Sequence, residues 1–265
     1  MRMTILFLFL LNSITLFAQS KAEINQKTNE ILAEANRLYR YEQTAWLGTD
    51  QAMIMENIRP DFEGYLVYES GDSIKILILN AAQQCILEIA YTDDFTKAAF
   101  QSDKKRDLGT REKELMKIKN TIISQIGKKK YEVGCPQGYN LNAVLIPDGK
   151  LYKLYVLTGT SRENVIPFGN DYLFTANIKG KITDFKKFHS RLIPAPTKYG
   201  DTKILSLSHS HLRSTPYITA TDICTFRLYA PLYGLESFSV YSPALSATFT
   251  YTLETNKIDI AFRNK

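Results

Sequence analysis

Alternating apolar and imidazole side chains predict a short strand in the last third of the chain. Leu205, Leu207, His209 and His211 occupy every second position, and alternate side chains of a strand lie on the same face. Both imidazoles are therefore expected on one face, beyond the leucines that anchor the strand. Asp222 follows at the start of a segment with helical spacing. Two imidazoles and a carboxylate are a common ligand set for catalytic zinc, so these residues predict a metal site.

Simpler interpretations of these residues remain open. Thr219 and Asp222 have the spacing of a helix N-terminal cap, with a hydroxyl and then an acid in the first turn. This role is compatible with metal binding. Paired histidines at a strand end can also be ordinary hydrogen-bonded surface residues. The third histidine of the chain, His189, would line the cleft if its strand adjoins the strand of His209 and His211. The favoured expectation is a surface or hydrogen-bonded strand residue, because a solitary histidine seldom binds metal.

The spacing resembles the signature of the JAMM (MPN+, JAB-type) zinc metallopeptidases. That signature is His-x-His-Pro, seven residues between the second His and a Ser, and then x-x-Asp. The chain departs from it at two positions, with Leu212 in place of the Pro and Thr219 in place of the Ser. The resemblance implies that His209, His211 and Asp222 bind zinc, and that Thr219 helps to polarise the scissile carbonyl.

A glutamate of this family takes a proton from the zinc-activated water and passes it to the leaving amine. Glu163 is expected in this role because it lies 46 residues before His209, next to a predicted strand. The family has Gly three residues after its glutamate, whereas this chain has Ile166. The alternative for Glu163 is a solvated loop residue beside Arg162. Other carboxylates that remain open as the base are Asp171, Asp184 and Glu132.

The pattern of strands and turns in residues 131–265 predicts an α+β fold with a mixed sheet and few helices. Two hairpins are expected, with turns at Asp148-Gly149 and Lys179-Gly180, and the second strand of the later hairpin is expected to run from 182 to 193. A helix is expected from Thr219 to Ala230, ended by Pro231, and three strands follow it. The JAMM resemblance covers roughly residues 155–255, and it implies the JAMM/MPN (cytidine-deaminase-like) core for this metallohydrolase domain.

The first part of the chain divides into a targeting segment and a second region. Residues 1–18 combine Arg2, an interrupted apolar run and Ala18, which predicts a signal peptide and a periplasmic or secreted protein with no membrane span after cleavage. Residues 19–130 predict a helix over 21–52 ended near Gly48, then three strands and a second helix over 110–126. This helix–three-strand–helix region contains no catalytic constellation, and its role is open.

The charge distribution and the cysteine content further restrict the possible partners and disulfide bonds of this protein. The formal charge of +6 is spread out, and the basic runs at 104–106 and 128–130 lack interleaved aromatics, so no nucleic-acid partner is expected. Three cysteines, Cys85, Cys135 and Cys224, leave at least one unpaired, and their pairing is open. Cys224 would point away from Asp222 on the predicted helix and is expected in the core.

These features together predict an exported zinc-dependent hydrolase of JAMM type. Its reaction would be cleavage of an amide bond, peptide or isopeptide, in a peptide or cross-linked peptide substrate, with zinc-activated water as the nucleophile. The alternative is a catalytically inactive JAMM-like binding or scaffold module of the cell envelope. A third interpretation is a structural envelope protein in which the first half carries the function. The identity of the substrate and the oligomeric state are left open.

Overall fold

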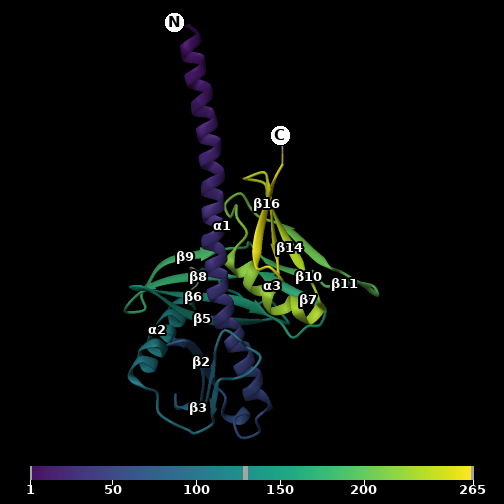
Figure 1. The fold of residues 1–265 in the computed structure, drawn as a ribbon. Coiled ribbons are helices and arrows are strands. Elements are labelled where there is room, and N and C mark those ends of the chain that lie inside the picture. Colours follow the sequence, from purple (N-terminus) through teal and green to yellow (C-terminus); the bar gives the residue numbers. More distant parts are fainter. Residues whose placement is uncertain (1, 128–130, 264–265) are drawn as a thin grey trace.

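The structure of the protein is a computed structural model that describes residues 2–127 and 131–263. Its longest element is the helix α1 (Arg2–Ile54), whose N-terminal part extends away from the body of the molecule (Figure 1). The later turns of α1 bury small and large apolar residues, among them Leu38, Tyr41 and Ala45. Because these positions recur every three or four residues, one stripe of the helix faces the core.

The predicted bounds of this helix were wrong at both the N-terminal and the C-terminal end. The helix begins upstream of residue 21 and continues through Gly48 to Ile54. Gly48 instead allows α1 to pack closely against β2, because a Cβ atom there would lie 2.4 Å from Cγ2 of Ile76. Residues 2–20 continue the helix, and cleavage of a signal peptide within residues 1–18 stays a prediction. Across the described part of the chain, no helix combines the length and hydropathy that a membrane span requires.

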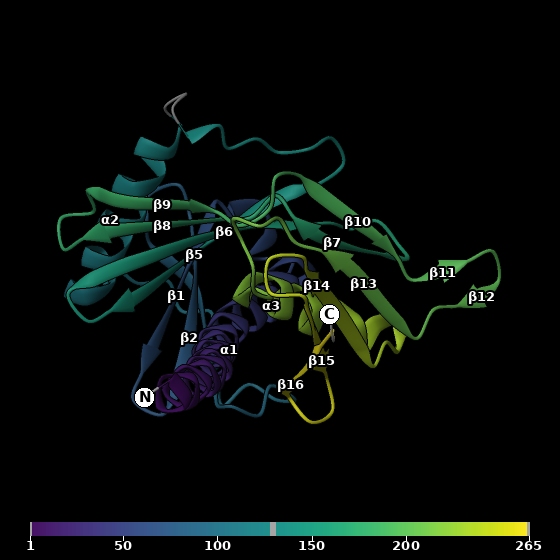
Figure 2. The same cartoon turned by 90° about the horizontal axis from the view of Figure 1, so that it is seen from above.

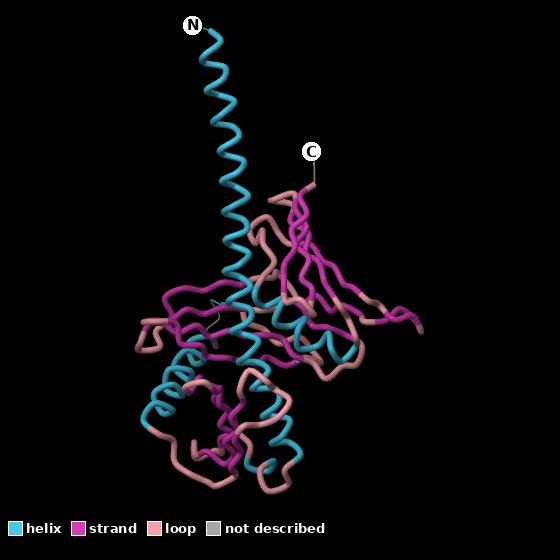
Figure 3. Tube along the Cα trace, in the orientation of Figure 1, coloured by secondary structure: helices cyan, strands magenta, loops and turns pink. Residues whose placement is uncertain are grey.

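A four-stranded antiparallel meander follows α1, in the order β1-β2-β3-β4. Its strands are β1 (Gly64–Ser70), β2 (Ser73–Leu79), β3 (Cys85–Tyr91) and β4 (Phe100–Ser102), preceded by a short 3-10 helix (Arg59–Asp61). Strand β2 is buried on both faces. Ile76 and Ile78 belong to the core cluster with α1, and Leu77 and Leu79 to the cluster with α2 (Thr110–Ile126). The meander therefore lies between the two helices, as Figure 3 shows.

The second four-stranded sheet is antiparallel, in the order β5-β6-β8-β9. Its strands are β5 (Asn140–Asp148), β6 (Leu151–Gly159), β8 (Tyr172–Asn177) and β9 (Ile182–Lys187). Both predicted hairpins are confirmed, with Gly149 and Gly180 in the left-handed conformation that their turns require. The second one is shorter than expected, because the chain leaves the sheet after Lys187 instead of continuing to 193.

The C-terminal part forms a third four-stranded sheet, in the order β13-β14-β15-β16 (Figure 2). Its elements are β13 (Ser206–Ser210), α3 (Ala220–Tyr233), β14 (Ser237–Ser242), β15 (Ala247–Thr252) and β16 (Lys257–Phe262). β13 and β14 pair in parallel, with α3 as the crossover between them. There are also two small antiparallel sheets of two strands each. One pairs β7 (Val165–Gly169) with β10 (Leu192–Pro196), and the other pairs β11 (Lys198–Tyr199) with β12 (Thr202–Lys203).

Helix α3 is longer than the sequence predicts. Pro231 lies inside its last turn, and the helix ends at Gly234, which has a φ of 60° and donates its backbone N–H to the carbonyls of Ala230 and Pro231. Pro231 is tolerated because only a single backbone hydrogen bond near the helix end is lost.

The α+β class is confirmed, with three α-helices and several antiparallel sheets among the described residues. One core cluster contains Tyr41 of α1, Ile76 of β2, Tyr155 of β6 and Cys224 of α3. The regions 19–130 and 131–265 therefore share a hydrophobic core. Cys224 is buried as expected, and all three cysteines are free thiols. The basic run at 128–130 lies outside the described residues.

Candidate metal site

Two of the predicted ligands come from the end of β13. His209 pairs with Val240 of β14, and the backbone N–H of His211 donates to the carbonyl of Tyr241 at 3.0 Å. The His209 ring packs beside the rings of Phe168 and Phe238, with centroids 5.3 and 6.3 Å away. Parallel pairing with β14 thus fixes the backbone, and aromatic contacts fix the His209 ring.

Asp222 belongs to the first turn of α3. Thr219 is the N-cap residue, and its hydroxyl accepts the backbone N–H of Asp222 at 3.1 Å. The Asp222 carboxylate returns the contact, since its Oδ2 accepts the Thr219 backbone N–H at 2.9 Å and the Thr219 hydroxyl at 2.6 Å. The capping interpretation of this pair is therefore confirmed. Capping and metal binding coexist, because the cap uses Oδ2 and leaves Oδ1 free.

The third histidine also reaches this place, which the sequence analysis considered only as the alternative to a surface or hydrogen-bonded strand residue. His189 is 5% exposed and lies where the chain leaves β9 and turns toward β10. The turn is possible because the residue packed against it is Gly169, which has a φ of 75° and no side chain. A Cβ atom on Gly169 would lie 2.3 Å from the carbonyl oxygen of Arg191 and 3.2 Å from Cβ of His189. Glycine at 169 is therefore required for His189 to occupy its position.

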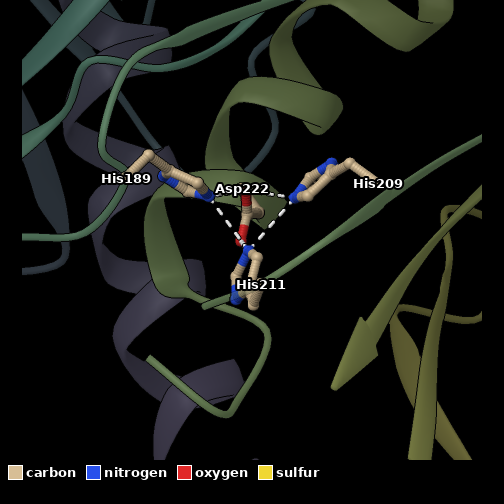
Figure 4. A group of neighbouring side chains, drawn as sticks. All are labelled: His189, His209, His211 and Asp222. Carbon is tan, nitrogen blue, oxygen red and sulfur yellow. Dashed lines mark hydrogen bonds and ion pairs between the residues drawn. The ribbon is translucent and has the colours of Figure 1, made fainter. Parts of the chain in front are cut away.

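Four ligand atoms converge on one point (Figure 4). Nε2 of His211 lies 3.0 Å from Nε2 of His189 and 3.1 Å from Nε2 of His209. Asp222 Oδ1 lies 3.2 Å from His189 Nε2 and 3.3 Å from His209 Nε2, and Asp222 Oδ2 lies 3.3 Å from His211 Nε2. A tetrahedral zinc ion with bonds of about 2.0–2.1 Å separates its ligand atoms by about 3.3 Å. These separations are close to that value, and the ligand atoms all lie within 4.8 Å of one another, so some of the side chains would move closer together to bind such an ion.

The outer nitrogens of two imidazoles determine which atoms face this point. Nδ1 of His189 lies 2.7 Å from Oδ1 of Asp171, and Nδ1 of His211 lies 2.7 Å from the carbonyl oxygen of Tyr217. Both partners accept, so both Nδ1 atoms carry a hydrogen and donate it. In the neutral rings the two Nε2 atoms then face each other with lone pairs at 3.0 Å. Such a contact is repulsive unless a proton or a metal ion lies between the nitrogens.

The charges of the site also favour a proton or a metal ion between these side chains. Oδ1 of Asp222 is buried and accepts no hydrogen bond, although two imidazole nitrogens lie within ion-pair distance. Burial opposes ionisation of Asp222, but the three imidazoles outweigh it and hold its pKa well below the usual range. Burial would lower the pKa of His189, but the Asp222 and Asp171 carboxylates raise it to about 11. Without a metal, a proton on Nε2 of His189 separates this nitrogen from Nε2 of His211, and a bound metal ion would take the place of that proton.

Asp171 completes the surroundings of His189. Its Oδ1 accepts from His189, and its Oδ2 accepts from the hydroxyl of Thr221, which lies on α3 next to Asp222. A carboxylate on the outer nitrogen of a metal-binding histidine fixes the ring and raises its basicity. Asp171, considered in the sequence as a proton acceptor, is placed by the structure as the partner of His189.

The other predicted site residues lie elsewhere. Glu163 is exposed, in the turn before β7, whereas the site adjoins Gly169 at the opposite end of that strand. The five residues of β7 alone span about 16 Å, so the structure does not bring Glu163 to the metal ligands. Asp184 and Glu132 are exposed as well. The Thr219 hydroxyl is engaged with Asp222, which leaves it no free hydrogen for a substrate carbonyl.

The site is closed by protein. His211 and Asp222 side chains are 1% and 0% exposed, and that of His209 is 8% exposed. A small cavity of about 100 Å³ adjoins it, lined among others by Phe188, Tyr217 and Thr219. The fourth position, which the sequence interpretation left for water, is occupied by His189. A complete set of protein ligands is typical of structural zinc sites, whereas catalytic sites keep a position open.

Comparison of the chain with protein-family models, with curated proteins and with solved structures gave no match. The fold and the site themselves define an α+β protein with a buried group of three histidines and one aspartate that could hold a metal ion.

Proposed function

We propose that this protein is a zinc-binding protein whose metal is held by His189, His209, His211 and Asp222. The observation that carries the proposal is the convergence of three imidazoles and the buried Asp222 carboxylate, whose ligand atoms all lie within 4.8 Å of one another. Three imidazoles and one carboxylate suit zinc better than calcium or magnesium, which prefer six or more oxygen ligands.

The ion would act first as a structural cross-link. Its ligands come from the β9–β10 connection, from β13 and from α3. Close to the site, Phe168 of β7 packs against Phe238 of β14, and Asp171 contacts Thr221 of α3. Zinc binding would therefore contribute directly to the stability of the C-terminal half.

Metal analysis of the purified protein tests this proposal. We expect about one zinc per chain in the wild type, and loss of zinc in Asp222→Asn and in His189→Ala. The matched control is Asp184→Asn, an exposed aspartate on β9 five residues before His189, which should keep its zinc. A folded wild-type protein that takes up no zinc at neutral pH would contradict the proposal. Zinc retained at full affinity in His189→Ala would remove His189 from the ligand set.

The JAMM-type hydrolase is the second candidate, and the order of elements favours it. A strand carrying His-x-His, a helix with the aspartate in its first turn and a parallel strand followed by Ser242-Pro243 are arranged as the resemblance implies. When bound, zinc would supply Lewis acidity and an activated water for cleavage of a peptide or isopeptide bond. This activity requires His189 to move off the metal, and the His189–Asp171 pair could then hold the proton that Glu163 is too distant to take.

Hydrolysis of cross-linked and linear peptides by the zinc-loaded protein distinguishes the two candidates. A hydrolase should lose activity in Asp222→Asn and keep it in Glu163→Gln, because Glu163 lies at the far end of β7. Absence of turnover with zinc fully bound favours the non-catalytic binding or scaffold module. Export to the periplasm or outside the cell remains a prediction, and sequencing the N-terminus of the mature protein would test cleavage near Ala18.

A further inference from the structure

A groove of about 1150 Å³ lies between α1, the β1–β2 turn, the loop after β3, α3 and the β15–β16 turn. None of the four metal ligands lines it. The residues that line it include three arginines, three aspartates and two asparagines. Its volume is slightly above the range of about 300–1,000 Å³ found for small-molecule sites. These features predict a charged ligand that is larger than a single metabolite.

The guanidinium of Arg227 is held in this wall without an anionic partner. Its carbon lies 3.8 Å from the ring centroid of Tyr39, and its Nη1 donates to Asn36 Oδ1 at 2.6 Å. Arg227 is half-buried on α3, and no carboxylate of the described residues forms an ion pair with it. A guanidinium carries several N–H donors in one plane, so most of them are left for a ligand.

The amides beside Arg227 add a further donor and no free acceptor. Asn36 Oδ1 accepts from Arg227 and also from Asn256 Nδ2 at 3.0 Å, and Asn256 Oδ1 accepts from the hydroxyl of Tyr251 at 3.0 Å. Both amide oxygens are therefore used within the chain. Nδ2 of Asn36 meets no acceptor among the described residues. An end of the groove with unmet donors and one cation suits a carboxylate.

The other two arginines of the groove are neutralised within the chain. Arg37 Nη2 lies 2.9 Å from Glu69 Oε2, and Arg40 lies 3.4 Å from Glu69 Oε1 and 2.8 Å from Asp93 Oδ1. Two cations thus face two carboxylates. Arg227 is the one uncompensated cation that the described residues contribute to this groove, so a singly charged carboxylate fits it better than a phosphate with two charges.

Two further carboxylates of the wall lack a cationic partner among the described residues. Asp72 and Asp94 are exposed, and Asp94 Oδ1 accepts the backbone N–H of Thr96 at 2.9 Å, which fixes its position. The backbone carbonyl of Asp72 accepts from Arg40 Nη2 at 3.4 Å, so this acidic end adjoins Arg40. Arg40 follows Asn36 by four residues, or about 6 Å along α1. The groove therefore offers a free cation and free carboxylates at neighbouring places.

We propose that this groove binds a short peptide of about two to four residues with free termini. The C-terminal carboxylate of the peptide accepts from Arg227 and from Asn36 Nδ2, and its N-terminal ammonium lies between Asp72 and Asp94. Three extended residues span about 10 Å, which is enough to join two ends about one helical turn apart. The groove has no residue in common with the metal site, so this inference does not rest on zinc binding.

Isothermal titration calorimetry with trialanine, in the presence of a chelator, tests the proposal apart from any metal site. We expect saturable binding, at least about tenfold weaker for N-acetyl-trialanine and for trialanine amide. Arg227→Gln should weaken trialanine binding by a similar factor and abolish the preference for the free carboxylate over the amide. Asp94→Asn can still accept from Thr96 and should reduce only the preference for the free amine. Arg213→Gln and Asp184→Asn, at exposed positions elsewhere, should bind as the wild type does.

The blocked peptides also define the results that overturn the proposal. Trialanine amide bound as tightly as trialanine removes the carboxylate site at Arg227. N-acetyl-trialanine bound as tightly as trialanine replaces the peptide site by a simple carboxylate site, and displacement of trialanine by inorganic phosphate replaces it by a phosphate site. No binding up to about 10 mM trialanine overturns the proposal outright. If Arg227→Gln fails to fold, the blocked peptides and Asp94→Asn carry the test.

Discussion

At the scale of single residues, the metal site depends on what lies behind each ligand. His189 is oriented by Asp171, His211 by the carbonyl of Tyr217, and Asp222 by Thr219. None of these contacts involves a metal ion, so they hold the side chains close to one another before an ion binds. Preorganisation of this kind lowers the entropic cost of binding.

Asp171→Asn should weaken zinc binding without removing a ligand. The asparagine can still accept the Nδ1 hydrogen of His189, but the negative charge that raises the basicity of the ring is lost. We expect affinity to fall by about 10–100-fold, measured by competition with a chelator of known affinity. Asp184→Asn is the control, and an unchanged affinity in Asp171→Asn would show that this carboxylate plays no part in metal binding.

Thr219→Ala should destabilise the metal-free protein, because α3 loses its N-cap. The expected loss in the free energy of unfolding is about 1–2 kcal/mol, measured by urea denaturation in the presence of chelator. Thr219→Ser keeps the hydroxyl and should recover most of this loss. If serine and alanine are equally destabilising, the methyl group rather than the cap is responsible.

At the scale of elements, local patterns predict much of the fold. Period-two alternation and the turns at Asp148-Gly149 and Lys179-Gly180 predict both hairpins, because the signal lies within a few residues. Three of the four site residues were also predictable from spacing alone. The position of His189 was not predictable in this way. Its approach to β13 depends on the end of β9 at Lys187 and on the positive φ of Gly169, which are features of the tertiary structure. Its one sequence signal is that the chain has three histidines and the structure gathers all of them.

Helix α1 and strand β2 approach each other through Gly48. Gly48→Ala should cost about 1–3 kcal/mol by overpacking, because the added Cβ would lie 2.4 Å from Cγ2 and 2.8 Å from Cδ1 of Ile76. The ordinary preference of helices for alanine over glycine acts in the opposite direction but is smaller, about 1 kcal/mol. Thermal unfolding measures the difference. Gly64→Ala, where nothing lies within 4 Å of the added atom, is the control, and a stabilised Gly48→Ala protein would contradict the packing seen here.

The N-terminus of α2 should make stability depend on acid pH. Burial would raise the pKa of Glu112, but Arg106, Tyr68 and the backbone N–H of Gly109 outweigh it and lower the pKa to about 2. Because the folded pKa lies below the unfolded one, near 4.5, the stabilisation is complete above pH 4.5 and is lost as the pH falls toward 2. Glu112→Gln should cost about 1–3 kcal/mol at pH 7.

Urea denaturation at pH 7, 4.5 and 3 tests this dependence. The difference in unfolding free energy between wild type and Glu112→Gln should shrink as the pH falls. Glu114→Gln, an exposed position on the same helix, should show no such trend. A difference that stays constant across this range would mean that Arg106 and Glu112 are not paired in the folded protein.

At the scale of the whole molecule, a hydrophobic core and a polar cluster connect different parts of the chain. A hydrophobic core joins α1 and the meander to β5, β6 and α3. The group of three histidines and Asp222 joins the β9–β10 connection to β13 and to the first turn of α3. Zinc at 100 times its dissociation constant would add about 2.7 kcal/mol to stability.

Anomalous-difference crystallography at the zinc edge, on crystals of the zinc-loaded protein, tests the central claim most directly. We predict one peak surrounded by Nε2 of His189, His209 and His211 and one oxygen of Asp222, at about 2.0–2.2 Å. A peak bound to His209, His211 and Asp222 with solvent in the fourth position would restore the open catalytic site and contradict the closed one. No peak among these four side chains would contradict the metal site altogether.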